Sequence, residues 1–370
     1  SFLFSISLSD SFAQTNLETK ILQGINFIYN VKFDSARSIF KEVISANPDK
    51  PEGYFFDAMT SWWAVNIERD NEAFYEDFFK KIEKVESVCD KLLDKNEDDA
   101  NALFYKGGAL GYRGLVYSLK DSWLKAAQDG KTALNLLDRA NELNPNNPDV
   151  KFGLGIYNYF AEYVPDKYPV IKPLMIIFPK GDKLKGLAQI KEIASTSLYA
   201  RTEAKFILAY LYSIYEKNYH EAQIYGQELV TAYPQNAFFR QLLNRSYIGQ
   251  SNWSAAIDGW QKTLALCDSN IFGFNEKLRR ESHYYLGVSY LFQRNLPEAE
   301  KNLLKAEELS RKVDKETTEI AADGWLKLGM AYDLMGNRGK ADGYYDKVQN
   351  QSNFSGLKEA AERLKRERFR

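Results

Sequence analysis

The residues of this chain that could carry enzyme chemistry are few and scattered. The two histidines, His220 and His283, have no ligand-like neighbour at helical spacing, so a histidine metal centre is not expected. The two cysteines, Cys89 and Cys267, are too far apart in sequence for a CxxC site or a disulfide framework. Neither cysteine has a histidine nearby, and no Ser-His-Asp set can be recognised. We therefore expect no catalytic residue, no metal, no cofactor and no enzymatic activity.

Two glycine-rich stretches could suggest phosphate binding, but both lack the rest of the motif. YKGGALGYRG, with Gly107, Gly108, Gly111 and Gly114, has no preceding strand and no Lys-Ser/Thr ending of the kind that completes a P-loop. The spacings of three and four residues place these glycines on one helical stripe, which favours close helix packing. PKGDKLKG also lacks that ending, and its Asp182 is expected to cap the following helix.

The composition argues against a nucleic-acid partner and favours helices. Lysine and arginine together number 49 against 50 aspartates and glutamates, so the formal net charge of -1 offers no general attraction for phosphate backbones. Tyrosine (24) and phenylalanine (23) are abundant, whereas prolines number only 10. This combination suits long helices that pack through aromatic side chains.

The first residues, SFLFSISLSDSFAQ, have the pattern of the end of a secretory signal peptide. Cleavage after Ala13 would leave Gln14 as the first residue, whereas the alternative is a frayed apolar tail on a cytoplasmic protein. No later stretch reaches the roughly 18 uninterrupted apolar residues of a membrane span. We expect residues 1–13 to be a signal remnant and residues 14–370 to form one domain, in the periplasm or outside the cell, without a transmembrane segment.

Internal repeats dominate the rest of the chain. Two stretches, HYYLGVSYLFQRNLPEAEKNLLKAEELS and WLKLGMAYDLMGNRGKADGYYDKVQN, carry small and large residues at matching positions. Small residues suit the points where two antiparallel helices touch, and large ones fill the space beside them. The matching positions are Leu286-Gly287, Tyr290, Ala299, Leu303 and Ala306 in the first stretch, and Leu328-Gly329, Tyr332, Ala341, Tyr345 and Val348 in the second.

This pattern resembles the tetratricopeptide repeat, whose period is about 34 residues. The resemblance implies an all-α, right-handed superhelical solenoid of about eight antiparallel helix hairpins. GLKEAAERLKRERFR, with Leu357, Ala361 and Leu364 on one face, is expected to form a C-terminal capping helix. FDSARSIFKEV and FPKGDKLKGLAQI further resemble the long-hairpin group of tetratricopeptide repeat protein 39 and the inclusion-body-clearance proteins, and similar exported bacterial proteins. That resemblance implies interaction and scaffolding.

Residues 161–182 interrupt the repeat. AEYVPDKYPVIKPLMIIFPKGD holds four of the prolines and cannot be regular helix, yet it is strongly apolar. Such a loop is expected to be buried, either by plugging the inside of the superhelix or by contacting a partner or a membrane surface. Its apolar residues are Val170, Ile171, Leu174, Met175, Ile176, Ile177 and Phe178.

The first helix of each tetratricopeptide hairpin lines the concave face, and the repeat register predicts which side chains point there. Aromatic residues at these positions offer large contact area, although aromatic stripes at helical spacing also form cores. Arg113 and Arg245 lie next to the stripe and are candidate anchors for a carboxylate. The predicted groove residues are Phe55, Trp62, Tyr105, Tyr112, Phe152, Tyr159, Phe206, Tyr210 and Tyr284.

The sequence therefore predicts an interaction scaffold that binds a peptide or protein partner in a concave aromatic groove. The competing hypothesis is a periplasmic carrier of a small molecule or lipid, in which the 161–182 loop closes an apolar cavity. A repeat array also leaves open self-association through its convex surface.

Overall fold

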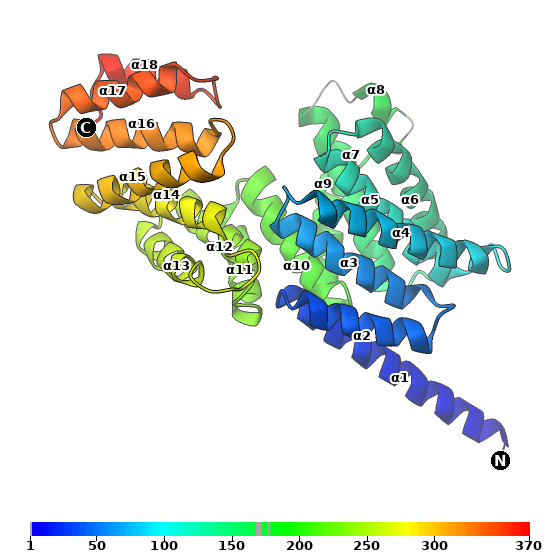
Figure 1. The fold of residues 1–370 in the computed structure, drawn as a ribbon. Helices are drawn as coiled ribbons and strands as arrows, with labels where there is room; N and C mark the ends of the chain where they lie inside the picture. Colours follow the sequence, from blue (N-terminus) through cyan, green and yellow to red (C-terminus); the bar gives the residue numbers. More distant parts are fainter. Residues whose placement is uncertain (1, 168–171, 177) are drawn as a thin grey trace. The chain divides into compact units, whose positions relative to one another are not determined.

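The structure of the chain is a computed structural model that describes residues 2–167, 172–176 and 178–370. Throughout these residues the regular elements are helices, and no strand occurs. Neighbouring helices pack in pairs, most of them joined by short turns, so the all-α helical repeat that the sequence predicts is confirmed (Figure 1). The helices group into two compact units, unit 1 up to Leu208 and unit 2 from Ala209 onward.

Unit 1 is built from helix pairs whose members contact each other along their lengths. The pairs are α1/α2, α3/α4, α5/α6 and α7/α9; the short α8 lies within the last pair, and α10 follows it. The bounds are α1 Phe2–Tyr29, α2 Phe33–Ala46, α3 Pro51–Ile67, α4 Glu72–Leu93, α5 Ala100–Leu119, α6 Trp123–Leu143, α7 Pro148–Lys167, α8 Lys172–Met175, α9 Lys183–Thr196 and α10 Arg201–Tyr210.

The helix α1 is continuous through the predicted cleavage point after Ala13. Its described buried side chains begin at Leu17. The signal remnant at residues 1–13 stays a prediction. Within the described ranges, no helix is long and apolar enough to cross a membrane.

Unit 2 contains the pairs α12/α13, α14/α15 and α16/α17 and ends in the predicted capping helix, α18. Ala361 and Leu364 of α18 are buried against unit 2, and Arg338 fastens the cap by donating to the Leu364 carbonyl oxygen at 3.1 Å. The bounds are η2 Leu211–Tyr215, α11 Tyr219–Ala232, α12 Ala237–Gly249, α13 Trp253–Leu266, α14 Glu276–Phe292, α15 Leu296–Val313, α16 Glu319–Leu334, α17 Arg338–Gln349 and α18 Leu357–Arg366.

The turns within the pairs α1/α2, α5/α6, α12/α13, α14/α15 and α16/α17 share one design. A residue in the left-handed region ends the first helix, and the next residue donates its backbone N–H to a carbonyl five positions back, which satisfies a free helix carbonyl. In unit 2 the next residue is an asparagine whose side chain caps the second helix, as Asn252, Asn295 and Asn337 do. The left-handed residues of this kind are Val31, Asp121, Ser251, Arg294 and Gly336.

One turn holds an extra residue. Asn218 donates to the Tyr212 carbonyl oxygen, six positions back instead of five. The additional residue is accommodated by the π-helical turn η2, Leu211–Tyr215, where the Glu216 N–H reaches the Leu211 carbonyl oxygen. The helix therefore widens locally, and the cap at Asn218 still forms.

Small residues lie where paired helices cross, as the repeat pattern predicts. A Cβ added to Gly287 would lie 2.5 Å from Leu303, and one added to Gly186 would lie 2.6 Å from the backbone nitrogen of Tyr159. The first contact involves a side chain that can move, whereas the second involves the backbone of the facing helix. The α7/α9 pair therefore depends on a glycine at position 186.

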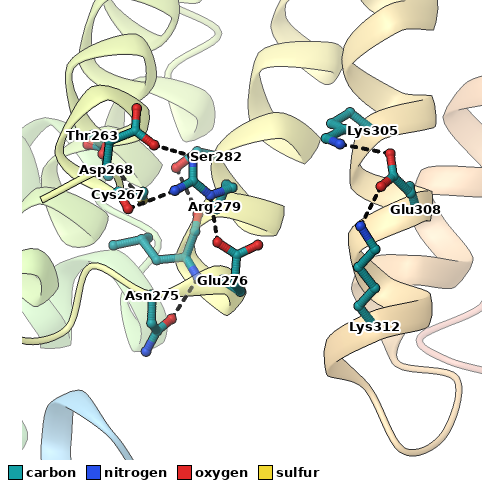
Figure 2. A network of polar contacts seen from close by, with 11 residues as sticks. Thr263, Cys267, Asp268, Asn275, Glu276, Arg279, Ser282, Lys305, Glu308 and Lys312 are labelled. Atoms are coloured by element: carbon teal, nitrogen blue, oxygen red, sulfur yellow. Dashed lines mark hydrogen bonds and ion pairs between the residues drawn. The ribbon is translucent and has the colours of Figure 1, made fainter. Parts of the chain in front are cut away.

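The long connection between α13 and α14 is fixed by Arg279 (Figure 2). Its guanidinium donates to the Cys267 carbonyl oxygen at 2.7 Å and forms ion pairs with Asp268 at 2.9 Å and Glu276 at 2.8 Å. Asn275 caps α14 by accepting the Leu278 N–H at 3.1 Å. These contacts set where α14 begins and hence which of its side chains share a face.

Gly186→Ala should lower the free energy of unfolding of unit 1 by about 2 kcal/mol, because the new methyl group meets backbone that cannot move aside. Gly111→Ala is the matched control, since its Cβ would lie 3.9 Å from Ala133, an ordinary contact. Urea unfolding of both variants measures the difference. Equal stabilities would contradict the close crossing of α7 and α9.

Candidate functional site

The predicted groove residues of unit 1 are mostly buried in the packing of the unit itself. Phe55, Trp62 and Tyr105 are each at most 8% exposed. The ring of Phe55 lies 5.2 Å from that of Tyr105 and 6.1 Å from that of Tyr112, and Trp62 lies 5.3 Å from Tyr112. These four aromatic side chains from α3 and α5 therefore form one cluster.

The other predicted groove residues of unit 1 are also buried, but in different surroundings. Phe206 of α10 packs on Trp63 with ring centroids 4.9 Å apart. Tyr159 of α7 stacks on Tyr163 at 5.8 Å, and Phe152 is buried on the same helix. Whether any of these side chains meets a partner stays a prediction.

A buried carboxylate that the sequence analysis missed joins this cluster. Glu203 of α10 is 5% exposed and accepts the hydroxyl of Tyr29 at 2.8 Å and the indole N–H groups of Trp63 at 3.1 Å and Trp62 at 3.4 Å. A further hydrogen bond comes from Tyr112. Four neutral donors from α1, α3 and α5 thus converge on one acid of α10, and we call this arrangement the Glu203 cage.

Burial raises the pKa of Glu203 above its usual value of 4.5, because removal from water penalises the charged form. The hydrogen bonds from Tyr29, Trp63, Trp62 and Tyr112 act in the opposite direction but do not outweigh burial. The cage thus solvates the carboxylate with fixed donors in place of water, and it ties α10 to the inner helices of unit 1.

The signal for this acid was present in the sequence. Three residues of one helix, Glu203, Phe206 and Tyr210, are spaced three and four positions apart. The acid therefore lies on the same helical face as the two aromatic residues that are predicted to line the groove. An acid on an apolar stripe needs hydrogen-bond donors when the stripe is buried. Its partners could not be named, because Tyr29 lies 174 positions away along the chain.

The two candidate anchor arginines already have carboxylate partners. Arg113 donates to Asp129 at 2.7 and 2.9 Å and to Glu86, and its hydrogen bonds to Asp129 are the main reason why its pKa is raised. Arg245 donates to Glu281 at 2.9 and 2.6 Å. Burial acts to lower the pKa of Arg245, but the charge and hydrogen bonds of Glu281, together with the nearby Tyr285 and Tyr210, outweigh it and the pKa is raised. A carboxylate ligand would have to compete with these partners.

In unit 2 the predicted residues remain partly open to solvent. Arg245 of α12 bonds to Glu281 of α14, and Tyr284, one turn further along α14, donates its hydroxyl to Asp323 of α16. Tyr210 lies beside this series, with its ring 6.5 Å from Phe238 of α12. Side chains of successive first helices are therefore linked into one series, which we call the first-helix row: Tyr210, Arg245, Glu281, Tyr284 and Asp323.

The row is accessible at Tyr210, Arg245 and Tyr284, whereas Glu281 is buried and the Asp323 side chain is only 15% exposed. The side chain of Arg245 keeps 34% of its exposure, and Tyr210 and Tyr284 are intermediate in burial. Asp323 is also paired with Lys327 of its own helix at 2.9 Å. Positive, negative and phenolic groups thus alternate across α12, α14 and α16.

The described part of the insertion packs on α6 and α7. Phe178 is half-buried, with its ring 6.3 Å from that of Tyr157 and 6.0 Å from the Lys131 ammonium, and Tyr157 donates its hydroxyl to the Pro179 carbonyl oxygen. Met175 is half-buried, whereas Ile176 is 83% exposed. Val170, Ile171, Ile177 and the side chain of Leu174 lie outside the described residues, so plugging of the superhelix stays a prediction.

The recurring turn and the small residues at helix crossings define the repeat in both units. This all-α helical repeat resembles the tetratricopeptide repeat. In the ranges that the structure describes, no group of three or more histidine, cysteine, aspartate or glutamate side chains is placed to hold a metal ion. The narrower resemblance to the tetratricopeptide repeat protein 39 group stays a prediction.

No protein-family model and no curated protein matches the chain. Among solved structures, PilF of Pseudomonas aeruginosa aligns with 70% of this chain and 96% of its own, at 15% identity and a TM-score of 0.42. The C-terminal part of a tetratricopeptide protein from Cytophaga hutchinsonii aligns with 82% and 98%, at 16% identity and 0.43. YrrB, a tetratricopeptide protein with an unusual peptide-binding site, aligns with 75% and 98%, at 16% identity and 0.32. Likenesses of this size carry no functional argument.

Removing the acid from the Glu203 cage should destabilise unit 1 strongly. Glu203→Ala leaves buried donors without an acceptor and opens a cavity, so we expect the free energy of unfolding to fall by about 3 kcal/mol. Glu203→Gln keeps the shape and one acceptor oxygen but turns an amide NH₂ group toward the donors on the other side, so its loss should be intermediate, about 1–2 kcal/mol. Urea unfolding followed by the indole proton signals of Trp62 and Trp63 measures both.

The same pair of proteins tests the charge state of the cage. Because the pKa of Glu203 is raised, the folded chain keeps a proton above pH 4.5 that the unfolded chain has lost. The free energy of unfolding of the wild type should therefore fall as pH rises from 4.5 through the raised pKa of Glu203. Glu203→Gln has no carboxyl at this position and should lack this part of the fall. Parallel pH profiles for the two proteins would show that the carboxyl does not titrate differently in the folded state.

Proposed function

We propose that the chain is a non-enzymatic interaction scaffold that binds a peptide or protein partner along the first-helix row of unit 2. The main support is the exposure of that row. Tyr210, Arg245 and Tyr284 remain partly open to solvent. The hydrogen bonds of Arg245 to Glu281 and of Tyr284 to Asp323 connect α12, α14 and α16. Residues of this kind, with large contact area and a polar tip, are enriched where proteins bind each other.

Unit 1 is a weaker candidate because its equivalent side chains are already in use. Glu203 and Phe206 of α10 occupy the aromatic cluster formed by α1, α3 and α5. A partner would first have to displace a segment of the same chain, which is held at high effective concentration. The predicted groove residues of unit 1 are therefore proposed as core, and those of unit 2 as binding residues.

The chemistry of the row favours a partner with mixed polar groups. Arg245 and Glu281 neutralise each other, so a strongly charged partner would gain little from either alone. The phenol of Tyr284 offers a flat apolar surface next to the Asp323 carboxylate. An extended peptide or a helix that places an apolar side chain beside a hydrogen-bonding group would match this pattern.

The carrier hypothesis remains the alternative. It requires an apolar cavity closed by residues 161–182, and the described end of that segment instead packs on α6 and α7. The contacts of the Phe178 ring with Tyr157 and Lys131 account for its partial burial without a bound molecule. The carrier is therefore the weaker of the two candidates.

Site-specific photocrosslinking tests the proposed surface. Tyr284 and, separately, Tyr210 are replaced by p-benzoylphenylalanine in the host that makes the protein. We expect both positions to capture the same partner, because they lie on one row. Arg245→Ala should reduce the captured amount about fivefold or more, since removal of one residue from a binding centre commonly costs over 1 kcal/mol.

Ile224 and Leu304 are the matched control positions for the crosslinker. Both are exposed apolar residues on second helices, α11 and α15, at 42% and 36% exposure. Capture of the same partner from these positions in equal amounts would contradict binding at the first-helix row. Native mass spectrometry of the same preparation separates the alternatives, because a bound mass of a few hundred daltons would favour the carrier.

Export through a cleaved signal peptide is part of the proposal. The pattern around Ala13 supports it, because small residues lie where signal peptidase acts. N-terminal sequencing of the protein from its own host should give Gln14 as the first residue. Recovery of a chain that still begins before residue 13, inside the cytoplasm, would contradict export.

A further inference from the structure

A small recess lies between α14, α15 and α16, next to the first-helix row. Its volume is about 10 Å³, which is the space that one water molecule needs. Tyr284 of the row forms part of its wall. The residues lining it are Arg280, Tyr284, Leu303, Ala306, Glu307, Ser310, Ile320, Ala321 and Gly324.

Arg280, which lines this recess, has an unused hydrogen-bond donor. Its Nη1 group donates to Asp314 at 2.5 Å and to Thr318 at 3.3 Å, and its side chain is 12% exposed. The Nε–H group of the same guanidinium is buried and has no protein acceptor. A buried donor without an acceptor is costly, and in native proteins such a group is usually satisfied by a water molecule or another bound group.

The electrostatics of the recess favour a neutral acceptor. The charge of Arg280 is already balanced by Asp314, whose side chain is 9% exposed. A second carboxylate, Glu307, also lines the recess and is 10% exposed, where it accepts hydrogen bonds from Trp325 and Lys347. An anion placed here would meet two acidic side chains, whereas an uncharged oxygen would accept from Arg280 without that repulsion.

Gly324 keeps the recess open. A Cβ built on this residue would find its nearest atom, Cδ2 of Tyr284, at 3.8 Å, so the position has room for a methyl group. The glycine is therefore not required by helix packing, unlike Gly186. A glycine in the middle of a helix lowers helix stability, and an open space beside an unused donor gives a reason for its presence here.

We propose that this recess is a binding site for one uncharged oxygen acceptor that completes the hydrogen bonds of Arg280. In the free protein the oxygen belongs to a water molecule, which can also donate to the Ser310 hydroxyl. When a partner lies along the first-helix row, a carbonyl oxygen of that partner takes the place of the water. The second statement rests on the proposed function, whereas the first does not.

The substitution Gly324→Ala tests the site, with Gly343→Ala as the matched control. Gly343 lies in α17, and a Cβ there would meet nothing within 4 Å. Both changes improve helix propensity, so Gly343→Ala should raise the midpoint of thermal unfolding. Gly324→Ala should give a smaller rise or a fall, because the methyl group displaces the water that serves Arg280.

Nuclear magnetic resonance of the Arg280 Nε–H group gives a direct readout. In the wild type we expect a resolved signal with slow exchange and a cross-peak to bound water, and in Gly324→Ala we expect faster exchange and loss of that cross-peak. Equal stabilisation by the two alanine substitutions, with an unchanged Arg280 signal, would overturn the site.

Titration with N-methylacetamide separates the two sources of oxygen. If a carbonyl can replace the water, the Arg280 Nε–H signal should shift in the wild type and not in Gly324→Ala. A wild-type signal that keeps its water cross-peak and ignores N-methylacetamide would overturn the carbonyl statement. Failure of crosslinking at Tyr284 would instead remove the proposed function, and the water measurement would still decide the recess.

Discussion

Unit 1 depends on the burial of one carboxylate among aromatic donors. An acid inside a protein is tolerated only where its oxygens accept hydrogen bonds, and Glu203 obtains them from Tyr29, Trp62, Trp63 and Tyr112. Those donors belong to α1, α3 and α5, so the three helices must present their aromatic side chains to the same point. The position of α10 on unit 1 follows from this requirement, and so does the closure of the aromatic cluster that the sequence predicts as a groove.

Unit 2 treats its polar groups differently. Its first helices pair charges with one another, as Arg245 does with Glu281, and the Arg245 side chain keeps 34% of its exposure although Glu281 is buried. The exposed part of Arg245 can therefore still contact a partner while its guanidinium is held in place by Glu281. The two units thus share one repeat, but in one the inner side chains form a core and in the other they form a surface.

The sequence was sufficient for the repeat and insufficient for the site. Gly287, Ala299 and Ala361 could be placed because small residues at fixed spacing have one structural meaning, that of close helix contact. Periodicity alone could not separate a buried aromatic stripe from an exposed one, because both repeat every three to four residues. The partners of Arg113 and Glu203 lie on other helices, and local spacing carries no information about such contacts.

The π-helical turn η2 illustrates how a helical repeat can take up one inserted residue. In an ordinary α-helix one inserted residue would rotate every following side chain by about 100°, since a turn holds 3.6 residues. The wide turn Leu211–Tyr215 takes up the insertion within five residues, and the cap at Asn218 keeps its usual form. A single-residue insertion at this point therefore does not rotate the side chains of the helices beyond it. Its structural effect is confined to one local turn.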